Sequence, residues 1–151
     1  MAGLRPFIAF VILAACSANQ TPREDRVHAT TPADTSVKLA SSLQVEVAQN
    51  EVRLVFHITN PTNQPVVLEF ATGQRYDFAV RAADGSEVWR WSADRMFTQA
   101  LGTETIPAGG TLNFSQTWAA TGRSGVFTAI AELKALNQPL EQRTIFEIRP
   151  R

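Results

Sequence analysis

The side chains that could do nucleophilic, acid–base or metal chemistry are few and widely separated in this sequence. The chain of 151 residues contains one cysteine, Cys16, and two histidines, His28 and His57. A zinc site usually needs four such ligands at short spacings, and no Gly-x-Ser-x-Gly nucleophile elbow is present. The spacing of the serine, histidine and aspartate residues in the sequence does not by itself exclude a catalytic Ser-His-Asp triad. The sequence therefore predicts a protein that is not an enzyme and that holds no metal or cofactor.

Cys16 has a different chemistry, because the residues before it have the pattern of an export signal. Arg5 precedes nine consecutive apolar residues, Phe7–Ala15, which is too short a run for a membrane-spanning helix of about 20 residues. Leu13-Ala14-Ala15-Cys16 resembles a bacterial lipobox, in which the chain is cut before the cysteine and the thiol is acylated. Each buried acyl methylene would contribute about 0.8 kcal/mol to membrane binding. The alternative is an ordinary secretory signal that ends near a cysteine.

These features divide the chain into three parts. We predict a signal peptide over residues 1–15, a lipidated Cys16 with a flexible tether over 16–42, and a folded domain over 43–151. The tether is rich in Thr, Pro, Ser and Asp and poor in large apolar residues, a composition that does not order itself. Ser17 after the cysteine is typical of lipoproteins sent to an outer membrane. The expected location is therefore the membrane of the cell envelope, on the periplasmic face or in the outer membrane if the source is Gram-negative.

The charge of the chain argues against one class of partner. Lys and Arg number 14, and Asp and Glu number 14, so the formal net charge is zero. Nucleic-acid-binding domains usually carry a basic excess on one face. We therefore expect no nucleic-acid partner.

The secondary structure that must position any functional side chain is predicted to be all-β. Val52, Leu54, Phe56 and Ile58 alternate with outward positions that include His57, the pattern of a half-buried strand. Strands are predicted over residues 43–48, 52–59, 66–70, 75–83, 87–92, 111–118, 126–136 and 143–149. About eight strands separated by turn residues predict an immunoglobulin-like antiparallel β-sandwich. Residues 93–100 are the least strand-like, and we expect an ordered loop or a single helical turn there.

One hairpin has a register that the sequence predicts. Asp84-Gly85 is typical of a two-residue type I′ turn. That turn places Val80 opposite Trp89 and Phe78 opposite Trp91, all on one side of the hairpin. A slip of one residue would put both tryptophans in water.

Three stretches on and beside this hairpin resemble the BsuPI family of intracellular proteinase inhibitors: Gly73-Gln-Arg-Tyr-Asp-Phe78, Glu87-Val-Trp-Arg-Trp-Ser92 and Arg95-Met-Phe-Thr-Gln99. The resemblance extends over about residues 43–136. It implies an immunoglobulin-like sandwich and the inhibition or regulation of a serine proteinase. The founding members act inside the cell, whereas this chain is predicted to be exported. The resemblance transfers no reactive-site residues to this sequence.

The signature residues fall into two groups with different expected roles. Large aromatic residues of the family signature are expected to build the core: Tyr76, Phe78, Trp89 and Trp91. The candidate partner contact comprises four residues that lie off the strand pattern: Asp94, Arg95, Met96 and Phe97. Exposed Met and Phe beside Arg are enriched at interface centres, although a helical turn packed on the sandwich would explain the same residue types.

Three functions are consistent with these observations. The first is a membrane-anchored binding protein that inhibits or regulates a proteinase, a serine proteinase by the resemblance, in the cell envelope. The second is a structural or assembly module that docks to another envelope protein through a sheet edge and does not affect proteolysis. The third is a binder of small ligands or glycans that uses exposed aromatic side chains.

Overall fold

The structure, a computed structural model, describes residues 38–150. The predicted signal peptide, Cys16, His28 and the tether as far as Val37 lie outside the described residues. Residues 38–150 form nine strands and no helix, which confirms the all-β prediction. The strands are β1 (Ala40–Val47), β2 (Glu51–Thr59), β3 (Val66–Phe70), β4 (Tyr76–Ala82), β5 (Glu87–Arg90), β6 (Gly102–Ile106), β7 (Thr111–Ala119), β8 (Gly125–Leu133) and β9 (Leu140–Ile148). Nothing in this range is a helix long and apolar enough to cross a membrane.

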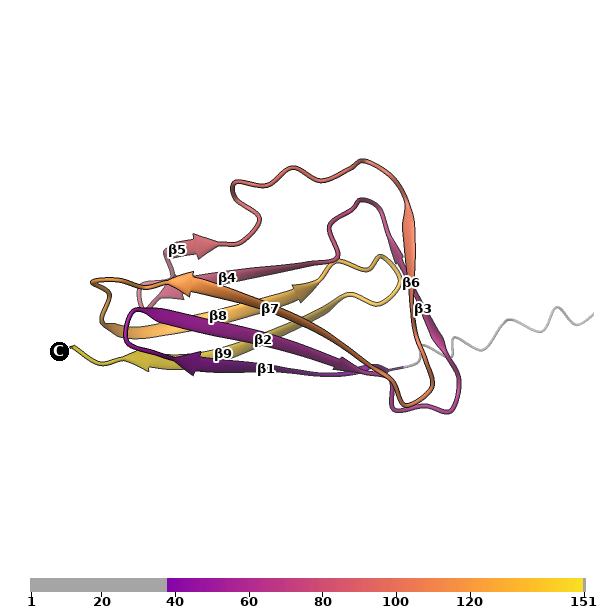
Figure 1. The fold of residues 1–151 in the computed structure, drawn as a ribbon, viewed down its shortest axis with the longest axis horizontal. Helices are drawn as coiled ribbons and strands as arrows, with labels where there is room; N and C mark the ends of the chain where they lie inside the picture. The colour runs from indigo at the N-terminus through magenta and orange to yellow at the C-terminus, as the bar shows by residue number, and fades with distance from the viewer. Residues whose placement is uncertain (1–37, 151) are drawn as a thin grey trace, which may run out of the picture. The chain divides into compact units, whose positions relative to one another are not determined.

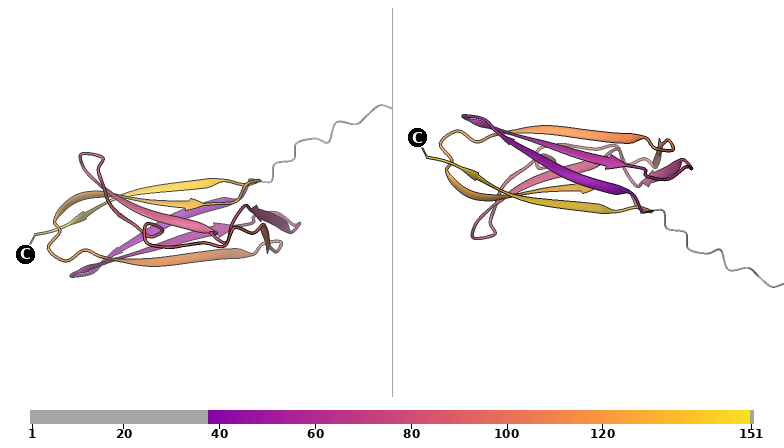
Figure 2. Two further views of the ribbon diagram at one scale, coloured as in Figure 1. Left: turned by 90° about the horizontal axis from the view of Figure 1, so that it is seen from above. Right: turned by 90° about the horizontal axis from the view of Figure 1, so that it is seen from below.

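The strands form three antiparallel sheets. One sheet has the order β1-β2-β7, a second has the order β5-β4-β8-β9, and β3 pairs with β6. The two larger sheets lie as layers in Figure 2, and Figure 1 shows β3 and β6 crossing one end of these layers. The predicted antiparallel β-sandwich is thus confirmed, and its immunoglobulin-type connectivity stays a prediction.

The inner faces of the two larger sheets form one core. The predicted alternation along residues 52–59 is confirmed, because the apolar members Val52, Leu54, Phe56 and Ile58 are all fully buried. Between the sheets, the Trp118 ring meets the edge of the Phe127 ring at a centroid distance of 5.5 Å. The burial of these side chains is the main source of stability of the domain.

Side-chain hydrogen bonds between β9 and β1 join the two larger sheets along one side. Thr144 Oγ1 on β9 donates to Leu43 O on β1 at 3.0 Å, and Gln142 Nε2 donates to Ser41 Oγ at 3.0 Å. The opposite sheet margins are β5 and β7. The long connection from β5 to β6 starts at this second side (Figure 1).

Four strands differ from the sequence-based prediction by three residues or more. β8 ends at Leu133 rather than at residue 136, and β9 begins at Leu140 rather than at residue 143. β6 was not predicted, because Ile106 is its only large apolar residue and alternation is therefore invisible; the strand exists through its pairing with β3, in which Val66 lies opposite Ile106. β1 begins at Ala40 rather than at residue 43, and Leu39 before it is buried at 3% exposure. The first residues of the sandwich therefore precede the predicted strand.

The turn between β4 and β5 also differs from the predicted one. Gly85 N donates to Ala82 O at 2.9 Å, and Gly85 has a φ of 85°. A type I′ turn over Asp84-Gly85 needs a positive φ at both residues, and no described residue other than glycine has one. The prediction of a two-residue type I′ turn is therefore wrong, and a three-residue loop over residues 83–85 closes the hairpin.

The longer loop does not change the pairs that matter for the core. An irregularity in the pairing between Val80 and Arg81 takes up the extra residue, so that Val80 lies opposite Trp89 as predicted. Trp91 N then donates to Phe78 O at 2.8 Å. The predicted facing of both tryptophans is therefore confirmed.

Candidate functional site

The connection from β5 to β6, residues 91–101, is the longest in the described part of the chain and is called the β5–β6 segment below. It starts with two successive turns, in which Ala93 N donates to Arg90 O at 3.4 Å and Arg95 N donates to Ser92 O at 3.1 Å. The remaining residues have no regular secondary structure. Of the two predicted forms, the structure therefore has the ordered loop rather than a helical turn.

Trp91 at the start of the segment belongs to a stack of aromatic rings. The Tyr76 ring stacks on Trp91 at a centroid distance of 4.4 Å and on Phe114 of β7 at 4.3 Å. The Tyr76 hydroxyl accepts a hydrogen bond from Gln116 Nε2 at 2.7 Å. The stack therefore connects the margin of one sheet to that of the other and gives the segment a rigid base.

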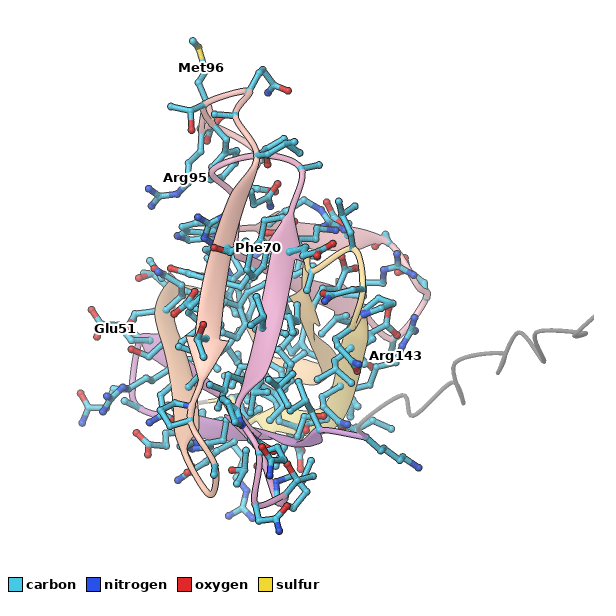
Figure 3. All side chains as sticks on the ribbon, turned by 90° about the vertical axis from the view of Figure 1, so that its right-hand side faces the viewer. Glu51, Phe70, Arg95, Met96 and Arg143 are labelled. Atoms are coloured by element: carbon cyan, nitrogen blue, oxygen red, sulfur yellow. The ribbon has the colours of Figure 1, made fainter. Side chains whose placement is uncertain are left out.

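Arg95 and Phe97 both rest on Trp91. The Arg95 guanidinium lies over the indole ring, 4.5 Å from its centroid, and Arg95 Nε donates to Trp91 O at 3.0 Å. The Phe97 ring lies 5.7 Å from the indole on a tilted plane. Met96 between them is 99% exposed, and Figure 3 shows its side chain extending away from the rest of the domain. The chain thus holds the two neighbours of Met96 and leaves Met96 itself in solvent.

The start of the segment is fixed by a buried carboxylate on β4. Asp77 is 2% exposed. Its Oδ1 accepts from Ser92 N at 3.2 Å, and its Oδ2 accepts from Ser92 Oγ at 2.7 Å. Oδ2 also accepts from Arg90 Nη1 at 2.7 Å, and Oδ1 from Phe78 N at 2.9 Å. A buried charge is tolerated when it is paired and hydrogen-bonded in this way.

Arg90 connects this carboxylate to a second one on its own strand. Its Nη2 donates to Glu87 Oε2 at 2.7 Å. The hydrogen bond holds the pKa of the Glu87 carboxyl below its ordinary value, and the two acidic partners, Glu87 first and then Asp77, raise the pKa of Arg90 above its ordinary value. Arg90 is therefore charged at all physiological pH values and links β4 to β5.

The later part of the segment is held by a close contact with Gly73. Gly73 N donates to Thr98 O at 2.8 Å, and a Cβ atom on Gly73 would lie 2.5 Å from Thr98 Oγ1. Such a distance is not tolerated without a shift of the threonine. Glycine at this position therefore allows the segment to lie directly against the chain before β4.

The predicted site residues occupy the following positions. Phe78 is fully buried, whereas the other three signature aromatics are half-buried against the core: Tyr76, Trp89 and Trp91. Of the candidate contact residues, Asp94, Arg95 and Met96 are exposed and Phe97 is half-buried. Their roles stay predictions, and Cys16 lies outside the described residues.

Sequence reasoning missed the residues that fix the segment to the sandwich. Asp77, Ser92 and Gly73 were not among the predicted site residues. One signal was available, because Asp77 lies between two aromatic residues in a strand that is otherwise apolar as far as Val80. A charged residue in such a strand needs a partner in the folded protein.

The segment offers contacts and no reactive centre. No group of three or more His, Cys, Asp or Glu side chains that could hold a metal ion occurs among residues 38–150. A cleft beside the segment is lined by residues of both sheet margins: Trp89, Arg90, Trp91, Asp94, Arg95, Gln116 and Thr117. The indole Nε1 of Trp91 is buried without a hydrogen-bond partner in the described part of the chain. An exposed Met96 beside this cleft is an arrangement that can contact another molecule.

Comparison with known families matches the chain to BsuPI, described as intracellular proteinase inhibitor, over residues 39–138. This range contains β1–β8 and the whole β5–β6 segment. No curated protein matches the chain.

Solved structures resemble the chain only distantly. A penta-heme cytochrome c552 from Thermochromatium tepidum has a TM-score of 0.48 at 9% identity over 75% of this chain. An alkylpurine DNA glycosylase from Pseudomonas fluorescens has a TM-score of 0.43 at 16% identity over 76%, and a β-glucosidase from Erythrobacter marinus has 0.41 at 11% over 73%. The aligned parts span 40%, 31% and 15% of those three proteins.

Proposed function

Because the chain belongs to the BsuPI family of intracellular proteinase inhibitors, we propose that it binds and inhibits a serine proteinase through its β5–β6 segment. One observation carries this proposal. The family-signature residues Gly73, Tyr76 and Asp77 each contact the segment, and the segment presents the exposed Met96. These residues therefore act together to present one stretch of chain. We do not expect a member of an inhibitor family with such a segment to be an enzyme.

Inhibition by a loop depends on how rigid the loop is before it binds. A flexible loop loses conformational entropy on binding, about 0.5–1.5 kcal/mol for each side chain that becomes fixed. Many small inhibitors hold their loops with disulfides, but this chain has a single cysteine. Stacking on Trp91 and the hydrogen bonds to Asp77 and Gly73 supply the rigidity here.

The proposed site of action is the cell envelope. This rests on the signal-peptide pattern and on Cys16 in the lipobox-like sequence. An exported inhibitor would meet proteinases outside the cytoplasm, unlike the family members that act inside the cell. Replacing Cys16 by Ser should abolish labelling with a fatty-acid analogue and release the protein from membranes. Unchanged labelling and retention of the variant would contradict the lipoprotein assignment.

The inhibitory function is tested with the purified full-length chain in detergent. Inhibition constants are measured against a panel of serine proteinases: subtilisin, chymotrypsin, elastase and trypsin. A variant in which the whole contact is changed, with Arg95, Met96 and Phe97 replaced by Ala, should lose inhibition. A chain that inhibits no member of the panel would contradict the proposal. Co-purification of another envelope protein in that case would favour the assembly module, for which the free edges of β5 and β7 are candidate docking sites.

A further inference from the structure

We propose that Met96 is the specificity residue of this inhibitor. Its side chain enters the primary substrate pocket of a proteinase in which that pocket is large and apolar, and the β5–β6 segment docks as a substrate does. This inference rests on the proposed function and goes further, because it names the residue and the class of pocket.

The exposure of Met96 is the first argument. Its side chain is 99% exposed, although burial of apolar surface is favourable by about 25 cal/mol per Å². Met is unbranched and adapts to irregular apolar cavities. A partner that covers this side chain therefore gains binding free energy that the isolated domain leaves unused.

The direction of the side chain is the second argument. Arg95 and Phe97 both contact the indole of Trp91, and Met96 extends away from the domain (Figure 3). Alternation of this kind is what an extended chain produces. A proteinase binds its substrate in an extended form, with one side chain filling the pocket beside the bond to be cut. The segment already presents Met96 outward between two neighbours that are held against Trp91.

Arg95 is the competing candidate, and its contacts with Trp91 disfavour it. A trypsin-like pocket carries an aspartate and would take an arginine. The Arg95 guanidinium already lies over Trp91, and its Nε donates to Trp91 O at 3.0 Å. Entering a pocket would break both contacts and release the loop from its base. The contacts therefore assign Arg95 to positioning and leave Met96 for the pocket.

The same contacts explain how the loop resists cleavage. Hydrolysis of the Met96–Phe97 bond adds water, with OH going to the Met96 carbonyl carbon and H to the Phe97 nitrogen. Arg95 on one side of this bond and Phe97 on the other both stay on Trp91. The new ends therefore remain adjacent, a situation with a high effective concentration that favours resynthesis of the bond. In a substrate without such contacts, the two new chain ends would separate after cleavage, and the bond would not be resynthesised.

The test replaces Met96 by Lys and by Asp in the full-length chain, assayed in detergent against subtilisin and chymotrypsin, which have apolar pockets, and against trypsin. Ile145→Lys is the matched control, because Ile145 is a 73% exposed apolar residue on β9, outside the β5–β6 segment. We expect Met96→Lys to lose inhibition of the apolar-pocket enzymes by about 30-fold or more and to gain inhibition of trypsin. Met96→Asp should inhibit neither class, and Ile145→Lys should behave as the wild type. Thermal melting should be unchanged in all three variants, because neither side chain is packed in the domain.

The outcomes separate the two proposals. Wild-type inhibition of subtilisin or chymotrypsin that survives in Met96→Asp would overturn the role of Met96 and leave the proposed function standing. Loss of inhibition in Met96→Lys without a gain toward trypsin would overturn the substrate-like pocket assignment. A wild-type chain that inhibits none of the enzymes would overturn both proposals.

Discussion

The connections on the two sides of β5 are built in opposite ways. The turn that enters the strand is held by its own neighbours: the Asp84 carboxylate accepts from Ser86 N at 2.9 Å and from Ser86 Oγ at 2.6 Å. The β5–β6 segment that leaves the strand is held from a distance in sequence. Its Trp91 stacks on Tyr76, and its Thr98 O accepts from Gly73 N. The first connection is local, and the second exists only when the sandwich is folded.

The proposed binding loop gains its rigidity differently from the local turn. A local turn forms from its own few residues and has little surface to offer. A longer segment offers more surface but has more conformational entropy to lose. The segment is fixed to Tyr76 through Trp91, and to Asp77 and Gly73 by hydrogen bonds, so its shape is a property of the folded core. Stability of the domain and function of the segment should therefore be coupled, whereas the turn should be independent of both.

Removal of the shared base should have the largest effect. Trp91→Ala removes the ring that lies between Tyr76 and the side chains of Arg95 and Phe97. We expect a loss of about 3 kcal/mol in the free energy of unfolding, together with loss of inhibition. Urea unfolding of the full chain measures the first effect. Trp91→Phe is the control, because it keeps an aromatic ring for stacking and removes the indole N–H that has no partner in the described chain. If Trp91→Ala were as stable as Trp91→Phe, the stack would not be the base of the segment.

The contact at Gly73 should give a smaller effect that can be reversed. Gly73→Ala places a methyl group 2.5 Å from Thr98 Oγ1, and we expect a loss of about 1–2 kcal/mol from overpacking. The position of Thr98 Cβ, 3.7 Å from the new methyl group, is ordinary contact. Thr98→Ala should therefore restore most of the stability in the double variant.

A double-mutant cycle distinguishes this steric contact from a general intolerance at residue 73. Thr98→Ala alone should change the free energy of unfolding by less than about 0.5 kcal/mol, because Thr98 is exposed. A coupling energy near zero between the two substitutions would show that Gly73 does not act through Thr98.

The local turn offers the matching test on the other side of β5. Gly85 has a φ of 85°, and a Cβ atom added to it would have no neighbouring atom within 4 Å, so Gly85→Ala adds only backbone strain, about 1 kcal/mol. Gly85→Asn should cost less, since Asn tolerates this conformation. Inhibition should be unchanged in both variants. A parallel loss of inhibition in Gly85→Ala would contradict the independence of the two connections.

The sequence predicts the local features of this fold well, for a physical reason. Alternation along residues 52–59 reports directly which side of a strand is buried, and the opposition of Val80 and Trp89 follows from the same alternation. The predicted type of turn was wrong because Asp84-Gly85 is compatible with loops of two and of three residues. The irregular pairing after Val80 compensates for the extra loop residue, so the pairs beyond it are the same for both loop lengths. β6 escaped prediction because its order comes from β3 and not from its own residues.

The candidate site could be located from the sequence but not understood from it. Residues 94–97 stand out because they break the strand pattern. Nothing in their spacing says that Arg95 lies over Trp91 or that Gly73 contacts Thr98, because both facts depend on how β4 and the segment approach each other. Burial of Asp77 has the same origin, since Arg90 and Ser92 cover it only in the folded hairpin.

The smallest expected effect is the pH dependence of the free energy of unfolding that comes from the Arg90–Glu87 ion pair on β5. Arg90 binds Glu87, three residues before it, and Asp77 on the neighbouring strand, and its hydrogen bond lowers the pKa of Glu87. A carboxyl with a lowered pKa in the folded state stabilises the protein above its unfolded pKa of about 4.3, and this contribution is lost as the pH falls through the folded value. Glu87→Gln should therefore be less stable than the wild type at pH 7 by no more than about 0.5 kcal/mol, because the pair is partly exposed. Urea unfolding at pH 7 and pH 3 should show this difference shrinking toward zero in acid. A difference that is equal at both pH values would mean that the Glu87 charge does not contribute, and that Asp77 alone holds Arg90 in place.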